Sequence, residues 1–137
     1  MQDILIGVLT WISANSSYNV EQFTPNLTFT EPSNICANYG INHKGRCDAS
    51  QLVAFYNKKN TIYLPLEFNH QSKEDQSILV HELVHYLQWS SNKNKQVCLG
   101  KLEVEAYELQ DKWRTSHNME STLDPFKMIM LAASCDD

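Results

Sequence analysis

Two histidines and a glutamate near the middle of the chain have the types and spacing of a metal site. The segment His81-Glu82-Leu83-Val84-His85 has the pattern H-E-x-x-H within a run that is typical of a helix. On a helix, side chains four residues apart project side by side, so His81 and His85 can bind one Zn²⁺. Glu82 lies one position further round, where its carboxylate can reach a zinc-bound water without ligating the metal. The pattern predicts a zinc site with Glu82 as general base.

The apolar residues of the same run predict which way these side chains face. They fall on one side of the helical wheel, opposite both histidines, so we expect that side to pack in the core and the histidines to face a cleft. The alternative is a chance H-E-x-x-H on an ordinary helix. A histidine pair plus a glutamate on the polar side of the helix favours the metal site. The expected core residues are Leu79, Val80, Leu83, Val84 and Leu87.

A catalytic zinc needs a third protein ligand and one open coordination position. The metzincin arrangement is excluded, because Gln88 and Ser91 stand where it requires glycine and histidine. No His, Asp or Glu occurs between His85 and Glu103. The nearby candidates are Cys98, Glu103, Glu105, Glu108 and Asp111.

A second helix, expected over residues 100 to 116, sorts these candidates. Glu108 and Asp111 fall opposite its apolar stripe, so we expect both to be exposed. Glu103 and Glu105 lie on opposite flanks of the stripe, and the periodicity leaves both open. Glu105 has a simple alternative partner in Lys101, four residues earlier. The stripe consists of Leu99, Leu102, Ala106, Leu109 and Trp113, and Cys98 is assigned to a disulfide.

These two helices together resemble the gluzincin clan of zinc peptidases. His81-Glu82-x-x-His85 followed by Glu103-Val104-Glu105-Ala106-Tyr107 is similar to members with an E-x-E-A-D or E-x-x-A-D glutamate helix. The resemblance implies that Glu103 is the third ligand and that the residue four positions later orients a zinc histidine. That residue is Tyr107 here in place of the aspartate. A tyrosine can still hydrogen-bond a histidine or stabilise an oxyanion.

The size of the chain, the hairpin expected before the motif, and His-Glu-Leu-Val-His-Tyr-Leu-Gln also resemble the minigluzincins and small secreted bacterial relatives. The resemblance covers residues 51 to 113 and implies a zinc metallopeptidase. Glu82 would take a proton from the zinc-bound water as it attacks a peptide carbonyl, and would pass it to the leaving amine. Tyr107 and His117 are the candidates for stabilising the oxyanion.

A different class of function stays open. Only about 50 residues follow the motif to build a substrate-binding floor, which suits a catalytically weak or inactive zinc module that binds a protein partner. The glutamate beside the metal argues for the peptidase, since binding alone needs no base. A closed structural zinc site is disfavoured, because three ligands and a base describe an open site.

The elements around the motif predict an α+β fold. We expect a single, zincin-like domain over residues 1–137, with a short antiparallel sheet packed on an N-terminal helix and the H-E-x-x-H helix, followed by a glutamate helix and a C-terminal helix. The expected helices cover residues 3 to 14, about 72 to 89, 100 to 116, and a stretch starting at Asp124-Pro125; a strand lies near 26 to 30, a loop over 31 to 50, a hairpin over 51 to 64 and a loop over 90 to 97.

Two interpretations of the strand Thr61-Ile62-Tyr63-Leu64 are open. It is either the sheet edge to which an extended peptide substrate adds, as the gluzincin resemblance implies, or a plain core strand whose Ile62 and Leu64 pack inward.

Charge and composition limit the partners. The chain of 137 residues has a formal net charge of −5 and no cluster of Lys and Arg, which argues against nucleic acid and anionic membranes. No apolar run reaches the roughly 18 residues of a membrane span. We expect a soluble monomer whose partner is a peptide or protein substrate.

The four cysteines suggest an oxidising compartment. They are even in number and lack C-x-x-C spacing, so two disulfides are expected, with Cys36–Cys47 and Cys98–Cys135 the favoured pairs. The alternative is a cytoplasmic protein with four free thiols. The start of the chain has no signal-peptide pattern, so we expect a mature secreted or periplasmic protein from which that segment was removed.

Overall fold

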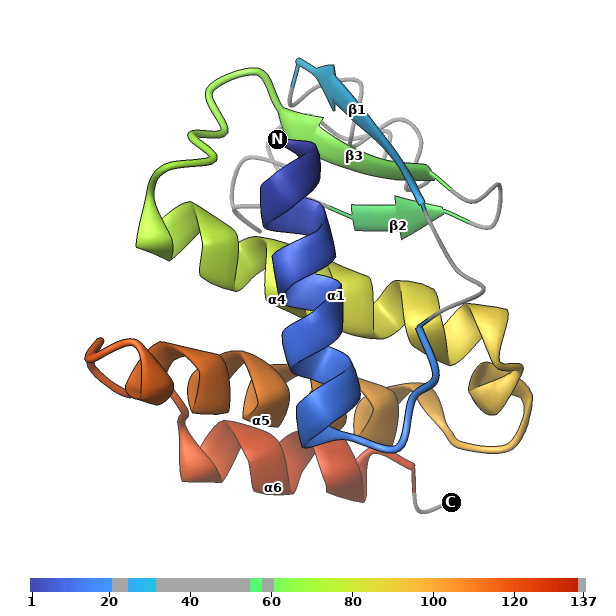
Figure 1. Ribbon diagram of the computed structural model, residues 1–137. Coiled ribbons are helices and arrows are strands. Elements are labelled where there is room, and N and C mark those ends of the chain that lie inside the picture. Colours follow the sequence, from blue (N-terminus) through green and yellow to red (C-terminus); the bar gives the residue numbers. More distant parts are fainter. Residues whose placement is uncertain (21–24, 32–54, 58–60, 136–137) are drawn as a thin grey trace.

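The structure is a computed structural model that describes residues 1–20, 25–31, 55–57 and 61–135. A small sheet lies above the long helix α4 (Lys73–Ser90), and α5 (Leu99–Ser116) and α6 (Pro125–Ala133) follow below it in turn (Figure 1). The first helix, α1 (Gln2–Asn15), crosses α4 and contacts it. The predicted α+β class is therefore confirmed.

The sheet is mixed and contains three described strands in the order β1-β3-β2. β1 (Asn26–Thr30), predicted from the sequence, runs parallel to β3 (Thr61–Pro65), with Asn26 opposite Thr61 and Thr30 opposite Pro65. β2 (Phe55–Asn57) runs antiparallel to β3. The prediction of an antiparallel sheet is thus wrong for its longest pairing. Residues 31–60 give β1 and β3 more than the dozen residues that a parallel connection requires.

Other expectations fall partly or wholly outside the described residues. The rest of the predicted hairpin, residues 51–54 and 58–60, is among them, as are nearly all of the expected loop over residues 31 to 50 and the expected pair Cys36–Cys47.

β3 is the central strand of the described sheet, so the interpretation of this strand as an open edge for substrate is wrong. Its neighbours β1 and β2 hydrogen-bond to it from both sides. Ile62 and Leu64 are fully buried, which agrees with the core-strand interpretation.

The helices begin within two residues of the sequence prediction, and α1, α4 and α5 also end within two residues of it. Side-chain caps explain the starts of α4 and α6. The Ser72 side chain accepts a hydrogen bond from the backbone N–H of Asp75 at the start of α4. Asp124 accepts from the N–H groups of Phe126 and Lys127, and Pro125 takes the first position of α6. A short 3₁₀ helix, η1 (Lys93–Lys95), lies where only a loop was predicted.

The core lies between α1, β3, α4 and α5. All five residues predicted for the core side of α4 are buried, with at most 1% of their surface exposed. Each contributes roughly 1.5–3 kcal/mol by leaving water. This burial fixes the rotation of α4 and leaves its two histidines on the side toward α5. The main core residues of the other elements are Leu5, Val8, Leu9, Ile12, Ile62, Leu64, Ala106, Leu109 and Trp113.

Polar contacts hold α4 and α5 in antiparallel register at both ends. At one end, the buried Arg114 donates to Glu74 Oε2 at 2.6 Å. At the other, Gln88 Nε2 donates to the carbonyl oxygen of Leu102 at 2.9 Å. The residues between these contacts are therefore held at fixed positions across the two helices.

α6 is attached to α5 by close contact and by a disulfide. A Cβ at Gly100 would lie 2.0 Å from the backbone oxygen of Leu131, so only glycine permits this approach. Cys98 and Cys135 form a disulfide with 5.9 Å between their Cα atoms, which confirms that predicted pair. The outer side of α6 exposes Phe126, Ile129 and Met130.

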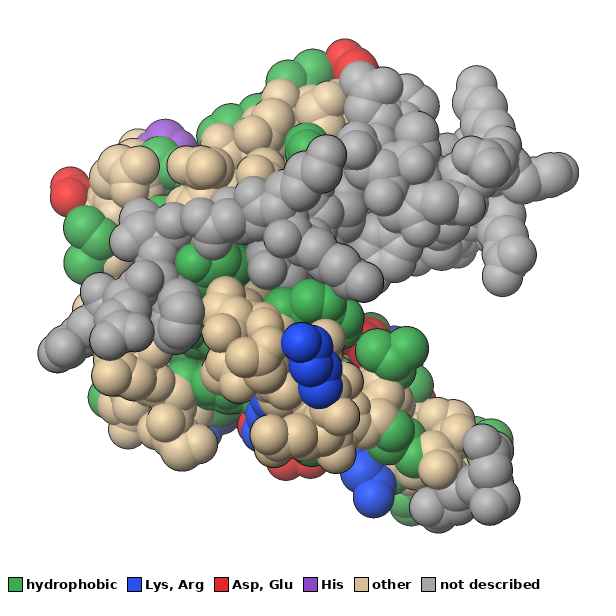
Figure 2. Space-filling model, turned by 90° about the vertical axis from the view of Figure 1, so that its right-hand side faces the viewer, with side chains coloured by type: hydrophobic (Ala, Val, Ile, Leu, Met, Phe, Trp, Pro, Cys, Tyr) green, Lys and Arg blue, Asp and Glu red, His purple; other side chains and the backbone are tan. Residues whose placement is uncertain are grey.

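Figure 2 shows that Lys, Arg, Asp and Glu side chains are scattered over the described part of one face and form no broad patch of one charge there. None of the helices in the described part of the chain has the length and apolar character needed to cross a bilayer.

Candidate metal centre

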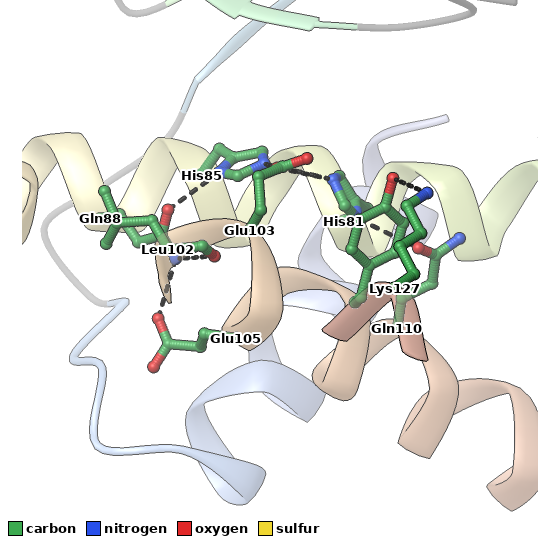
Figure 3. Close-up of polar contacts among 9 residues, drawn as sticks. His81, His85, Gln88, Leu102, Glu103, Glu105, Gln110 and Lys127 are labelled. Carbon is green, nitrogen blue, oxygen red and sulfur yellow. Dashed lines mark hydrogen bonds and ion pairs between the residues drawn. The ribbon is translucent and has the colours of Figure 1, made fainter. Parts of the chain in front are cut away.

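His81, His85 and Glu103 converge between α4 and α5. Their potential ligand atoms all lie within 4.8 Å of one another (Figure 3). The two Nε2 atoms are 3.2 Å apart, and His81 Nε2 is 3.3 Å from Glu103 Oε1, which also contacts His85 Nε2. Tetrahedral zinc with bonds of about 2.0–2.1 Å places its ligand atoms about 3.3 Å apart. The Nε2–Nε2 pair and the pair of His81 Nε2 with Glu103 Oε1 match that spacing, whereas His85 Nε2 and Glu103 Oε1 lie closer together.

A glutamine oxygen lies at the Nδ1 atom of each histidine. Gln88 Oε1 is 2.8 Å from His85 Nδ1, and Gln110 Oε1 is 3.0 Å from His81 Nδ1. An acceptor at Nδ1 stabilises the form of the ring that carries its hydrogen there. With Nδ1 occupied by a glutamine oxygen, both Nε2 atoms face Glu103 and the position that a metal ion would take.

Neither glutamine was predicted as a partner of the histidines. Gln88 served only to exclude a metzincin, although it lies one helical turn after His85. Gln110 is seven residues, or two turns, after Glu103, so it shares a helix face with that residue. The sequence contains both spacings, but they indicate contacts with the histidines only once the register of α4 against α5 is known.

Tyr107, which stands where the gluzincin pattern has an aspartate, contacts His81 through its ring. The two rings pack edge to face with centroids 4.6 Å apart. The Tyr107 hydroxyl accepts a hydrogen bond from Lys127 Nζ at 3.0 Å. Among the described hydrogen bonds, the partner of His81 Nδ1 is Gln110, so the orienting role expected at residue 107 falls to a residue one turn later.

Glu105, the competing candidate for the third ligand, lies beyond Gln88 and away from the histidine pair (Figure 3). It accepts hydrogen bonds from Gln88 Nε2 at 2.9 Å, from Lys93 Nζ at 2.7 Å and from the Tyr18 hydroxyl. Its cationic partner is thus Lys93 and not Lys101, the partner considered from the sequence.

The other candidates also lie apart from the group of three. Glu108 is exposed, as expected, whereas Asp111 is partly buried and accepts hydrogen bonds from Ser121 and the backbone of Thr122. His117 stacks on Trp113 at the end of α5.

The whole chain, residues 1–137, matches a family described as a domain of unknown function (DUF6647). The chain belongs to the DUF6647 family. No curated protein and no solved structure matches it. The geometry and charge of the site itself are therefore what indicate its chemistry.

The charges around the DUF6647 site favour a bound cation. Burial acts to raise the pKa of Glu103, but hydrogen bonds from His81 and His85 outweigh it and hold that pKa well below its usual range. Burial acts to lower the pKa of His85, but Glu103 and Glu82 outweigh it and raise that pKa. An ionised carboxylate thus stands between the two imidazoles, with a second carboxylate close enough to act on His85.

That second carboxylate, Glu82, is buried on α4 directly after His81. Its charge acts to raise the pKa of His85, as a carboxylate close to the histidine pair does. The predicted general base and the three predicted ligands are thus neighbours in the fold.

Proposed function

We propose that this chain is a zinc-dependent metallopeptidase of the gluzincin type, in which His81, His85 and Glu103 hold the metal and Glu82 is the general base. One observation carries the proposal. Two imidazole Nε2 atoms and a carboxylate oxygen from two antiparallel helices meet at ligand spacing, and each imidazole has an acceptor at Nδ1.

The donor set fits zinc. Two imidazole nitrogens and one carboxylate oxygen form a combination known for catalytic zinc, and three protein ligands leave a position for water or substrate. Zinc supplies two effects when bound: it lowers the pKa of water, and it polarises a carbonyl group. The fully apolar side of α4 and the disulfide between α5 and α6 keep the two ligand-bearing helices rigid.

The residues of the site divide the remaining work. Glu82 takes a proton from the attacking water and passes it to the leaving amine of the peptide. Glu103, with its lowered pKa, stays ionised and gives the site an anionic ligand. Tyr107 is better placed than His117 to stabilise the oxyanion, because its ring packs on His81 and Lys127 donates to its hydroxyl.

We propose a peptide or protein as the substrate, and an oxidising compartment, extracellular or periplasmic, as the place of action. The Cys98–Cys135 disulfide supports the compartment, since such bonds persist mainly outside the reducing cytoplasm.

A catalytically weak zinc module that binds a protein partner is the second candidate. The exposed stripe of Phe126, Ile129 and Met130 on α6 favours it, because apolar residues spaced in this way suit a protein contact. Activity separates the two functions, since the module retains zinc but cleaves no peptide.

The proposal is tested by measuring zinc content and cleavage of a denatured protein. Wild type should carry about one zinc per chain, and His81→Ala should lose it. Glu82→Gln should keep the metal and abolish cleavage, with the exposed Glu108→Gln as matched control. If Glu82→Gln cleaves as fast as wild type, the mechanism is wrong. If wild type binds zinc but cleaves no denatured protein or peptide library, the second candidate replaces the first.

The choice of the third ligand has its own comparison. Glu103→Ala should lose stoichiometric zinc, whereas Glu105→Ala should still bind about one zinc, more weakly than wild type. Stoichiometric zinc in Glu103→Ala together with its loss in Glu105→Ala would overturn the assignment of Glu103.

A further inference from the structure

Gln88 connects His85 to the buried residues beside the site. Its side chain has no exposed surface and lies between α4 and α5. Nε2 donates to Leu102 O and to Glu105 Oε1, both at 2.9 Å, and Oε1 lies 2.8 Å from His85 Nδ1. All polar atoms of this amide group are therefore paired.

These contacts allow the amide only one orientation. If the group were flipped, its oxygen would face a carbonyl oxygen and a carboxylate, and its N–H groups would face Nδ1. The flipped oxygen would then face two other acceptor oxygens in a buried place with no hydrogen between them, which is unfavourable. The negative charge of Glu105 increases this cost. Glu105 and Leu102 O thus together determine that Gln88 presents its oxygen to His85, and Glu105 is the charged member of the pair.

Glu105 is itself held from two other elements. Lys93 of η1 donates to its Oε2 at 2.7 Å, and the hydroxyl of Tyr18, which follows α1, donates to its Oε1. Lys93 also lies over the Tyr18 ring, 5.2 Å from its centroid. A chain of contacts therefore runs from α1 and η1 through Glu105 and Gln88 to His85.

His81 has a simpler support. Gln110 contacts His81 Nδ1, and within the described residues no second hydrogen bond fixes the orientation of the Gln110 amide. This histidine provides an internal comparison for His85 in the same protein.

We propose that Glu105 is a positioning residue for the metal site: together with Leu102 O it holds the Gln88 amide, so that Gln88 Oε1 accepts from His85 Nδ1–H and the ring keeps Nε2 toward the metal position. This inference rests on the proposed function, because a positioning residue needs a metal site to position. The hydrogen bond of the His85 ring can nevertheless be measured without any assay of activity. The inference assigns to Glu105 a role separate from ligation.

The test follows the Nδ1–H signals of both histidines by ¹⁵N NMR in the zinc-loaded protein, where the metal occupies Nε2 and the hydrogen is on Nδ1. It also measures zinc affinity by competition with a chelator. In wild type, the His85 Nδ1–H should exchange slowly with solvent, because the buried Gln88 accepts it. In Glu105→Ala, this hydrogen should exchange faster while that of His81 is unchanged, and zinc affinity should fall about tenfold. Glu108→Ala, on the exposed side of the same helix, is the control and should match wild type.

Glu105→Gln separates positioning from a loss of folding. Its side-chain oxygen can still accept from Gln88, so it should restore the slow exchange of the His85 Nδ1–H and bring zinc affinity within about threefold of wild type. Circular dichroism checks that each variant is folded, and if Glu105→Ala does not fold, Glu105→Leu takes its place. Unchanged exchange of the His85 Nδ1–H in Glu105→Ala and zinc affinity within twofold of Glu108→Ala would overturn the inference. Failure of the peptidase proposal alone would leave the NMR result intact.

Discussion

The two histidines of the candidate metal centre are supported in different ways. His85 lies near the end of α4, where Gln88, Glu105, Lys93 and Tyr18 form a paired network that joins α4, α5, η1 and the segment after α1. His81 lies one turn earlier, where Gln110 holds its Nδ1 and Tyr107 packs on its ring. The His85 end of the site is thus supported by buried, paired side chains. The His81 end is formed largely by partly or fully exposed side chains of α5 and α6.

This difference suggests a division of roles within one small site. A buried and fully paired end holds its ligand side chain in place before the metal binds, so little rearrangement is needed on binding. An end lined by Tyr107 and the exposed Lys127 leaves N–H and O–H donors that can turn toward a substrate. The following variants test whether the contrast is real, from the largest expected effect to the smallest.

Replacement of Gln88 should have the largest effect. Gln88→Leu removes the partner of His85 and takes one donor each from Leu102 O and Glu105 Oε1. Unfolding free energy should fall by about 2–3 kcal/mol, and zinc affinity by roughly 10- to 100-fold. Urea denaturation and chelator competition measure these changes. Gln71→Leu, at an exposed glutamine just before α4, is the control and should change neither quantity appreciably.

Replacement of Gln110 should cost affinity with little loss of stability. Gln110→Leu removes the acceptor at His81 Nδ1, but Gln110 is only partly buried and its amide has no further described hydrogen bond. Zinc affinity should fall by up to about tenfold, and unfolding free energy by less than about 0.5 kcal/mol. The same two measurements apply. Equal stability losses in the Gln110 and Gln88 variants would remove the contrast between the two ends.

Much of this arrangement could be predicted from the sequence, because it depends on local patterns. The spacing of His81, Glu82 and His85 and the apolar side of α4 need only the geometry of one helix. Ser72 and Asp124 mark the helix starts that the structure has. The resemblance to a glutamate helix selected Glu103, which does lie with the two histidines.

What could not be predicted depends on contacts between distant residues. A strand pattern gives no direction or neighbour, so the parallel pairing of β1 with β3 and the central place of β3 were missed. The roles of Gln88, Gln110 and Glu105 appear only after Arg114–Glu74 and Gln88–Leu102 fix the register of α4 and α5. An amide side chain has donors and acceptors for many partners, so its residue type alone selects none of them.

Alkaline pH should weaken the buried network through Tyr18. Burial, followed by the hydrogen bond to Glu105 and its charge, raises the pKa of Tyr18 well above the usual value of 10.0. Because the unfolded chain loses this proton first, the stabilisation is complete below about pH 10 and is lost as pH rises further. The loss should be at most about 1.4 kcal/mol per pH unit for this one group.

Tyr18→Phe isolates that contribution. At pH 7 it should cost about 1 kcal/mol, the usual value of one hydrogen bond. Between pH 9 and about 11, its urea midpoint should fall less steeply than that of wild type. Identical slopes would mean that Tyr18 does not titrate with folding. Tyr63→Phe, on β3, controls for the loss of a tyrosine elsewhere.

Replacement of Lys127 should have the smallest effect on metal and stability. Lys127→Met keeps an apolar stem on α6 but removes the donor to the Tyr107 hydroxyl and the charge 4.3 Å from the centre of its ring. Because Lys127 is exposed, unfolding free energy should change by less than about 0.5 kcal/mol, and zinc affinity should stay within about twofold of wild type. Chelator competition provides the decisive comparison. If Lys127→Met weakens zinc as much as Gln110→Leu does, then α6 supports His81 through Tyr107, and the exposed end of the site positions the metal as the buried end does.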